Sequence, residues 1–471
     1  MLFHSDADRV IEIFEELCSI PHGSGNTAAI SAHIAAFAEK LGLPCIRDDA
    51  NNLIIKKEGT PGYEDHAPVI LQGHIDMVCE KAPNVDFDFE KEGLKLRRDG
   101  DYLSATNTTL GADNGIAVAY AMALMESKDI PHPPLEIVLT SDEEIGMLGA
   151  AALDTTPLKG RTMLNLDSEE EGVFTVGCAG GVRLCLSVPV TRTPVKGDTY
   201  LLQLRGGVGG HSGAEIHRGI ANAIRVMAHS LSEAEGLRLV SFSGGGKDNA
   251  IPSSCEAVFV LPKRMKRDKI DVNLLWNIAK HLDTDPKLRY HMERLKPVKE
   301  ALDETSTRAA LRLLTATPDG VQAMSPHIEG LVQTSLNLGV VRLDEAIHAT
   351  FLVRSSVNRE KEALRSWLEG FAVALGGTSE ATGDYPAWEY RESSPLRDCM
   401  IRAYKELTQA EPRVEVIHAG LECGLFSGKL EGLDAVAIGP EMHDIHTPRE
   451  RISLSSIDRT WTFIQRVLKA L

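Results

Sequence analysis

Three short apolar runs in the first third of the chain each end in a cluster of polar residues. The runs 69–71, 135–139 and 163–166 lead into Gly73-His74-Ile75-Asp76, Ser141-Asp142-Glu143-Glu144 and Asp167-Ser168-Glu169-Glu170-Glu171. Segments with helical spacing of apolar residues separate the runs, and this alternation favours an α/β fold with a mostly parallel sheet. In such sheets ligands bind outside the carboxyl ends of the strands. We therefore expect these polar clusters to lie at one edge of the sheet.

The length of 471 residues is too great for one ordinary domain. From about residue 190 the alternation of apolar runs and helical segments gives way to a different pattern of strands and helices. The α/β alternation returns after about residue 385. We expect a mostly parallel-sheet domain made of residues 1–189 and 386–471, which carries these polar strand ends, with an α+β lid domain inserted at 190–385. Within the insert, the charged stretch 268–315 has a mostly helical pattern.

The net charge limits the possible partners, and the cysteines and apolar stretches indicate the cellular compartment. A formal net charge of −17 disfavours nucleic acid and anionic membranes. The eight cysteines include no C-x-x-C pair, which indicates free thiols in a reducing compartment. The acidic N-terminus is unlike a signal peptide, and the longest strongly apolar stretch, 116–125, is shorter than the ~20 residues needed to span a bilayer. We expect a cytoplasmic protein.

The polar strand ends offer the ligands of a metal site. His74 and Asp76 are two residues apart, so both side chains project from one face of a strand end. Asp113 stands just before an Ala-rich helical segment, where a plain N-cap or turn aspartate is the alternative. Gathered carboxylates repel one another and call for a cation.

A pair of divalent cations fits this set of residues. With one hydroxide, the carboxylates of Asp113, Glu144 and Asp167 neutralise four positive charges, and His74 and His446 supply neutral nitrogen ligands. Zinc accepts this mixture of ligands. Paired metals ~3.5–4 Å apart need a bridging group, and we expect Asp113 to be that bridge.

Two further carboxylates have expected roles beside the metals. Glu143 is placed to act as the general base, and Asp76 to hydrogen-bond His74 and fix its ring. On physical grounds alone the roles of Glu143 and Glu144 could be exchanged.

Two residues of the insert are candidates for substrate contact. His211, in the glycine-rich stretch 206–213, could stabilise a developing oxyanion, although a simple turn is the commoner role of such a loop. Arg354, at a strand end, could clamp a carboxylate with two hydrogen bonds, although most arginines of this kind are only surface residues.

Several motifs resemble one known group of enzymes. The residues His74-x-Asp76, Gly111–Gly115, Thr140–Glu144, Asn165–Glu171 and His446 resemble the zinc-dependent aminoacylase/carboxypeptidase superfamily. A second set is similar, more closely, to the bacterial aminoacyl-histidine dipeptidase family, also called cytosol nonspecific or beta-alanyl-histidine dipeptidases: 177–181, 209–217, 249–252 and 418–426. The resemblance covers nearly the whole chain.

The resemblance implies a role for each motif residue. It assigns His74 and Asp167 to one zinc, Glu144 and His446 to the other, Asp113 to both, Glu143 to the general base and Asp76 to orienting His74. It also implies a cis Asp113–Asn114 peptide bond. It matches His211, Asn249 and Arg354 to lid positions that meet the substrate's scissile carbonyl or carboxylate, and we add Glu422, from the last motif, to the substrate-binding residues.

We therefore predict a dinuclear zinc dipeptidase that hydrolyses unsubstituted dipeptides, including Xaa-His types such as beta-alanyl-histidine. Metal-bound hydroxide would attack the peptide carbonyl with Glu143 as general base, and Co²⁺ or Mn²⁺ could replace zinc. Homodimerisation is implied by the resemblance alone. The alternatives are an N-acyl amino acid deacylase and a catalytically inactive metal-binding protein on the same scaffold.

Overall fold

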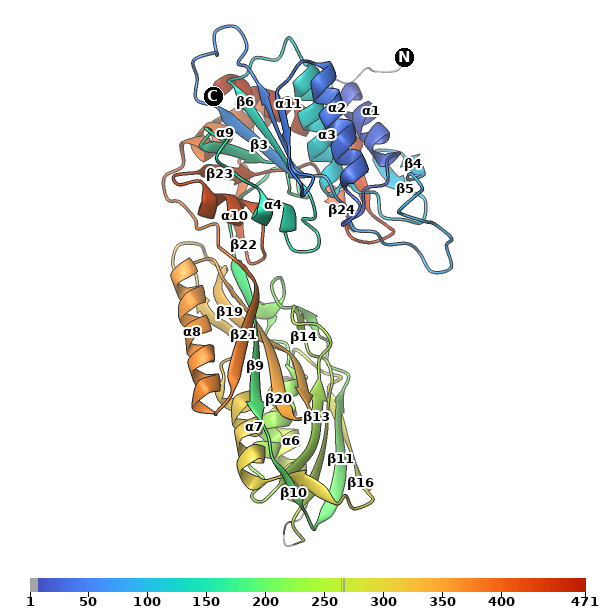
Figure 1. Ribbon diagram of the computed structural model, residues 1–471, viewed down its shortest axis with the longest axis vertical. Helices are drawn as coiled ribbons and strands as arrows, with labels where there is room; N and C mark the ends of the chain where they lie inside the picture. The colour runs from blue at the N-terminus through green and yellow to red at the C-terminus, as the bar shows by residue number, and fades with distance from the viewer. Residues whose placement is uncertain (1–6, 264, 266) are drawn as a thin grey trace. The chain divides into compact units, whose positions relative to one another are not determined.

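A computed structural model describes residues 7–263, 265 and 267–471 (Figure 1). The chain forms two compact units. The first unit comprises the described residues up to Gly177 together with Tyr390–Val416 and Leu421–Leu471, and the second comprises Cys178–Glu389 and Ile417–Gly420. The second unit is thus inserted into the sequence of the first.

The first unit is built on a mixed sheet of eight strands in its described residues, ordered β1-β2-β6-β3-β7-β23-β8-β22. Their bounds are β1 (Cys45–Arg47), β2 (Leu53–Lys57), β6 (Leu135–Thr140), β3 (Val69–His74), β7 (Thr162–Asn165), β23 (Asp434–Ala437), β8 (Val173–Cys178) and β22 (Arg413–Ile417). The four central strands, β6, β3, β7 and β23, run parallel, whereas the β1–β2, β2–β6 and β23–β8 pairs are antiparallel. Every residue of β3 and β6 is buried, as continuous apolar strands of a parallel sheet require. The predicted α/β fold with a mostly parallel sheet is confirmed.

Helices pack against this sheet (Figure 1). They are α1 (Asp8–Cys18), α2 (Ala28–Lys40), α3 (Ala112–Glu126), α4 (Leu148–Ala152), α9 (Pro395–Thr408), α10 (Glu422–Lys429) and α11 (Leu454–Ala470). Helix α3 contacts β3, and the Tyr120 ring of α3 stacks on Trp461 of α11 with ring centroids 5.9 Å apart. A small sheet of β24 (Met442–His443), β25 (Arg451–Ser453), β5 (Tyr102–Ala105) and β4 (Leu96–Asp99) completes the unit.

The second unit is an antiparallel sheet with helices. Its nine strands in the described residues follow the order β16-β11-β15-β13-β19-β20-β9-β21, with β18 beside β19. The bounds are β9 (Gly180–Pro189), β11 (Asp198–Arg205), β13 (Arg238–Gly244), β15 (Cys255–Leu261), β16 (Arg289–Leu295), β18 (Gly320–Met324), β19 (Val332–Leu343), β20 (Ala346–Ser355) and β21 (Thr378–Tyr385). Two short ribbons add β10 (Arg192–Pro194) with β17 (Glu300–Leu302), and β12 (Gly210–His211) with β14 (Ala250–Ile251). Its helices are α5 (Ala223–Ser232), α6 (Asp268–Ala279), α7 (Glu304–Ala316) and α8 (Asn358–Ala374), with the 3-10 helix η1 (Ile216–Arg218). Strand β9, at the end of which the sequence pattern changes, belongs to this unit because it pairs with β20 and β21.

The helical expectation for 268–315 is only partly correct. Helices α6 and α7 lie there, but β16 and β17 form between them. Strand β16 pairs on one side only, with β11, and most of its residues are exposed. An exposed, charged edge strand lacks the alternating apolar pattern that identifies a strand from sequence.

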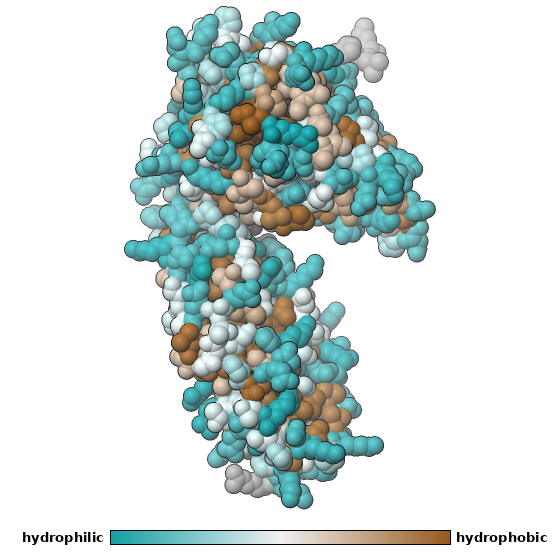
Figure 2. All heavy atoms as spheres, in the orientation of Figure 1, coloured by the Kyte–Doolittle hydropathy of each residue, from teal (hydrophilic) through white to brown (hydrophobic). Residues whose placement is uncertain are grey.

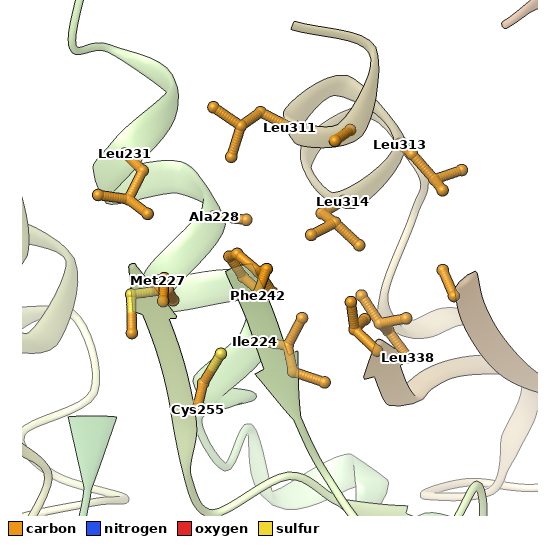
Figure 3. Close-up of a cluster of buried hydrophobic side chains, with 14 of the residues drawn as sticks. Ile224, Met227, Ala228, Leu231, Phe242, Cys255, Leu311, Leu313, Leu314 and Leu338 are labelled. Carbon is orange, nitrogen blue, oxygen red and sulfur yellow. The ribbon is translucent and has the colours of Figure 1, made fainter. Parts of the chain in front are cut away.

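The core of the second unit lies between its helices and its sheet (Figure 3). Ile224, Met227 and Leu231 of α5 are spaced to face one way and pack with Phe242 of β13 and Leu314 of α7. Hydrophilic residues cover most of the surface in view on both units (Figure 2). The eight cysteines all lie in the described residues, and none of them forms a disulfide bond, as expected. In the part of the chain that the structure describes, the helices fall short of the length and apolar character needed to cross a membrane.

Gly73 allows β3 and α3 to approach closely. A Cβ atom at this position would lie 2.5 Å from the Asn114 side-chain oxygen and 2.6 Å from the Ala117 Cβ. Asn114 cannot easily move away, because its side chain accepts a hydrogen bond from the His74 backbone N–H (3.1 Å) and donates one to the Leu166 carbonyl (2.9 Å).

We expect Gly73→Ala to lower the free energy of unfolding of the first unit by about 1–3 kcal/mol, the usual cost of overpacking. Urea unfolding monitored by circular dichroism measures this loss. Gly370→Ala is the control: position 370 lies within α8 with open space around it, so this change should be neutral or stabilising. Equal stability of Gly73→Ala and wild type would contradict the tight approach.

Candidate metal centre

His74 ends β3 with its ring held in one orientation. Its Nδ1 lies 3.0 Å from the Asp76 backbone carbonyl oxygen and 3.4 Å from Asp76 Oδ1. A carbonyl oxygen only accepts hydrogen bonds, so Nδ1 carries the proton. The other ring nitrogen, Nε2, faces carboxylate oxygens of Asp113 (3.2 Å) and Asp167 (3.6 Å). This is the orientation of a histidine ready to bind a cation through Nε2.

Asp113 stands between two histidines at the start of α3. Its Oδ1 lies 3.2 Å from His74 Nε2, and its Oδ2 lies 3.1 Å from His446 Nε2. His446 Nε2 in turn lies 3.0 Å from Glu144 Oε1. The Asp113–Asn114 peptide bond is cis, as the resemblance implies.

Within the described residues, three groups of side chains have ligand atoms that all lie within 4.8 Å of one another: His74–Asp113–Asp167, Asp113–Glu144–His446 and His74–Glu143–Glu144. The first two groups share Asp113. The structure thus brings together all five residues predicted as metal ligands. Glu143, the predicted base, lies beside them. Imidazole nitrogen and carboxylate oxygen are donors that zinc accepts, so the residues fit a pair of such ions.

The electrostatics of this region also favour cations. Burial, reinforced by neighbouring carboxylates, raises the pKa of Glu143, Glu144 and Asp167. Burial likewise raises the pKa of three further carboxyl groups nearby to about 7, those of Glu169, Glu422 and Glu450. Conversely, hydrogen bonds to Asp113 and Glu144 raise the pKa of His446 to about 11. The cluster holds more acid than its histidines can balance, and bound cations would relieve that repulsion.

Asp76 holds the backbone of the neighbouring glutamates as well as His74. Its carboxylate accepts hydrogen bonds from the backbone N–H groups of Glu143 (3.0 Å) and Glu144 (3.3 Å) and from Ser24 Oγ (2.8 Å). The Glu143 carboxylate itself has no hydrogen-bond partner in the described part of the chain, whereas Glu144 contacts His446. Glu143 is therefore available to exchange a proton.

Glu422 lies fully buried at the start of α10. Its Oε2 accepts hydrogen bonds from the side chains of Thr140 and Gln72, while Oε1 has no partner among the described residues. The Gln72 side chain also accepts a hydrogen bond from Asn165, whose own oxygen accepts the Asp167 backbone N–H (3.2 Å). Glu422 is thereby connected to the segment that carries Asp167.

The other predicted substrate residues belong to the second unit. His211 and Asn249 lie at the β12–β14 ribbon, where the Ser212 N–H donates to the Asn249 carbonyl (2.9 Å). His211 Nδ1 accepts the backbone N–H groups of Gly213 (3.3 Å) and Ala214 (3.1 Å), so its proton is on Nε2. The exposed His211 ring therefore presents a hydrogen-bond donor.

Arg354 is 7% exposed and donates from Nη1 to Tyr385 Oη (3.1 Å), whereas its Nε has no partner in the described residues. Ser335, which pairs with Arg354 across β19 and β20, has its Oγ 2.7 Å from His418 Nε2. Burial and the charge of Arg354 lower the pKa of His418 to about 3, so this ring is uncharged at neutral pH.

The sequence singled out neither His418 nor Tyr385 for a role. Both lie near Arg354 only because distant parts of the chain meet there. A glycine offers one clue: a Cβ at Gly181 would lie 2.6 Å from Tyr385 Oη, so the motif glycine leaves room for that ring.

Comparisons with known proteins agree with this geometry. A profile of peptidase family M20/M25/M40 matches residues 70–470. The cytosol non-specific dipeptidase of Escherichia coli (strain K12) is 37% identical over 473 residues, which cover 98% of this chain and 97% of that protein.

Solved structures give the same picture. The aminoacylhistidine dipeptidase of Vibrio alginolyticus superposes with a TM-score of 0.92 at 34% identity, over 99% of this chain and 97% of that one. The aminopeptidase PepT of Bacillus cereus shares the fold, with a TM-score of 0.58 at 16% identity over 99% of both chains. The family indicated by the sequence motifs is confirmed: the chain belongs to peptidase family M20/M25/M40, within the group of metallo-dipeptidases that includes the cytosol non-specific and aminoacylhistidine dipeptidases.

Proposed function

We propose that this protein is a cytoplasmic dinuclear zinc dipeptidase that hydrolyses unsubstituted dipeptides, including Xaa-His types such as beta-alanyl-histidine. The observation that carries the proposal is the position of Asp113, whose two carboxylate oxygens face His74 and His446. The names of the similar proteins, a cytosol non-specific dipeptidase and an aminoacylhistidine dipeptidase, support the substrate class and the compartment.

His74 and Asp167 would hold one metal, Glu144 and His446 the other, and Asp113 both. Bound zinc, or Co²⁺ or Mn²⁺ in its place, supplies Lewis-acid chemistry, because it polarises the scissile carbonyl and lowers the pKa of water. The supporting geometry is the pair of three-residue groups that share Asp113.

Glu143 is the general base of this proposal. It takes a proton from the attacking water and returns it to the leaving amine. Glu144 is hydrogen-bonded to His446, while Glu143 has no such partner in the described residues, which supports Glu144 as the ligand and Glu143 as the base. Asp76 orients both His74 and the backbone of this glutamate pair.

Four residues would bind the substrate. The guanidinium of Arg354 suits the substrate's carboxylate, because Nε is free of other partners in the described residues. The Nε2–H of His211 suits the oxygen of the scissile carbonyl, with Asn249 beside it on the same ribbon. Glu422 Oε1, an acceptor without a partner among the described residues, suits a substrate N–H.

We expect the purified protein to hydrolyse beta-alanyl-histidine but not N-acetyl-histidine, the corresponding deacylase substrate. A metal chelator should abolish this activity, and added Zn²⁺ should restore it. Release of free histidine, measured by chromatography, gives both rates. Faster hydrolysis of the acetylated substrate would favour the deacylase, and no hydrolysis of any unblocked dipeptide would favour an inactive metal-binding protein.

Glu143→Ala should lower kcat by about 10²–10⁴-fold, the usual contribution of a general base, while zinc content stays at the wild-type level. Atomic absorption on the purified variant measures the metal, and the dipeptide assay measures kcat. Glu39→Ala, on the exposed side of α2, is the control and should match wild type. Substantial residual hydrolysis by Glu143→Ala would rule out Glu143 as the base.

Arg354→Lys should raise KM for dipeptides about tenfold or more, because a lysine keeps the charge but cannot form two parallel hydrogen bonds to a carboxylate. Initial-rate kinetics with beta-alanyl-histidine separate KM from kcat. Arg359→Lys, at an exposed position of α8, is the matched control. An unchanged KM in Arg354→Lys would remove Arg354 from the substrate site.

A further inference from the structure

Glu450 has an unusual set of partners for a buried acid. Its side chain is only 2% exposed, and its carboxylate accepts hydrogen bonds from four consecutive backbone N–H groups. Oε2 accepts from Leu110 (2.8 Å) and Gly111 (3.2 Å), and Oε1 accepts from Ala112 (2.8 Å) and Asp113 (3.4 Å). The last of these residues is the one that faces both histidines.

The backbone of this turn is shaped to surround an anion. Gly111 has a left-handed conformation, with φ of 69°, immediately before α3. Successive N–H groups in such a turn converge to form an anion-binding concavity, and the start of a helix adds its own positive field. Another residue at this position would be strained, and its Cβ would lie 2.8 Å from Met77 Sδ.

Glu450 also belongs to the segment that carries His446. Its backbone N–H donates to the Thr447 carbonyl (3.0 Å), which closes the turn after His446. The His446 Nε2 lies 3.1 Å from Asp113 Oδ2, and the Glu450 carboxylate accepts a hydrogen bond from the Asp113 backbone N–H (3.4 Å). The two segments are therefore joined at two points.

The burial of the Glu450 carboxylate is not explained by an ion pair. Among the described residues no lysine, arginine or histidine forms an ion pair with it, and its side-chain hydrogen bonds are all with the turn 110–113. Residues that hold metal ligands in place, without binding the metal themselves, commonly change metal affinity by about 10–100-fold when they are substituted.

We propose that Glu450 is a positioning residue, which fixes the Asp113 turn relative to His446 so that the Asp113 carboxylate can serve two cations at once. Because the two-cation role of Asp113 belongs to the proposed function, Glu450 acts in this way only if that function holds. Glu450 itself contacts neither the substrate nor the metals in this role.

The test compares zinc affinity in Glu450→Gln, Glu450→Asp and wild type, by titration against a chromophoric chelator at pH 7. We expect Glu450→Gln to bind zinc about 10–100-fold more weakly, because the amide N–H₂ opposes two of the backbone donors. Glu450→Asp keeps the charge and should bind with intermediate affinity. A role in packing alone would give the opposite order, since glutamine matches the shape of glutamate better than aspartate does.

Glu136→Gln is the matched control. Glu136 is another buried glutamate of the first unit, and it accepts hydrogen bonds from the backbone N–H groups of Lys159 and Gly160 without contact to any candidate ligand in the described residues. Its substitution should cost stability but leave zinc affinity unchanged. Unfolding of the zinc-free proteins, followed by circular dichroism, separates the two effects.

Wild-type zinc affinity in Glu450→Gln, or an equal loss in Glu136→Gln, would overturn the role of Glu450. Asp113→Asn distinguishes this result from failure of the proposed function. If Asp113→Asn loses zinc while Glu450→Gln keeps it, only the role of Glu450 fails. If Asp113→Asn binds two zinc ions as wild type does, the shared-ligand function fails, and the role of Glu450 fails with it.

Discussion

The carboxylate of Asp113, placed between the imidazoles of His74 and His446, is the interaction on which the site depends. Buried acids surround it, and bringing them together without cations is costly, because burial and mutual repulsion both oppose their ionisation. A parallel sheet makes such a gathering feasible, since neighbouring strands end at the same edge. The fold therefore concentrates negative charge where metal ions can neutralise it.

Hydrogen bonds from backbone N–H groups to buried carboxylates hold these side chains in position. Asp76 accepts the N–H groups of Glu143 and Glu144 and also lies against His74, so one carboxylate ties two strand ends together. Glu450 does the same for the turn of Asp113 and the segment of His446. In both cases an acid that is not itself a candidate ligand determines where the ligands stand.

The candidate site residues that stand at the end of a buried strand are the ones that can be predicted from sequence. His74 and Asp76 are predictable because they stand at the end of a buried apolar run, where two-residue alternation places both on one face. Glu143 also follows such a run, but the run alone leaves its role exchangeable with that of Glu144. Asp113 and His446 follow no strand of the central sheet, so their inclusion depended on counting charge and on the resemblance. The α/β class is predictable from a different pattern, the alternation of buried apolar runs with helical segments.

Other features could not be predicted because they depend on contacts between distant residues. Glu450 stands in a charged stretch with no periodic pattern, and its role emerges only from its four backbone partners. His418 contacts Ser335, 83 residues away, through tertiary packing alone. The mostly helical pattern of 268–315 does not reveal strand β16, because an exposed edge strand carries charged residues on both faces.

Anomalous diffraction at the zinc edge from crystals of the zinc-loaded protein tests the shared role of Asp113 most directly. The shared role of Asp113 predicts two peaks ~3.5–4 Å apart, each about 2.0–2.2 Å from a different oxygen of Asp113. One peak should lie beside His74 and Asp167, and the other beside Glu144 and His446. A single peak, or two peaks of which only one lies next to Asp113, would contradict it.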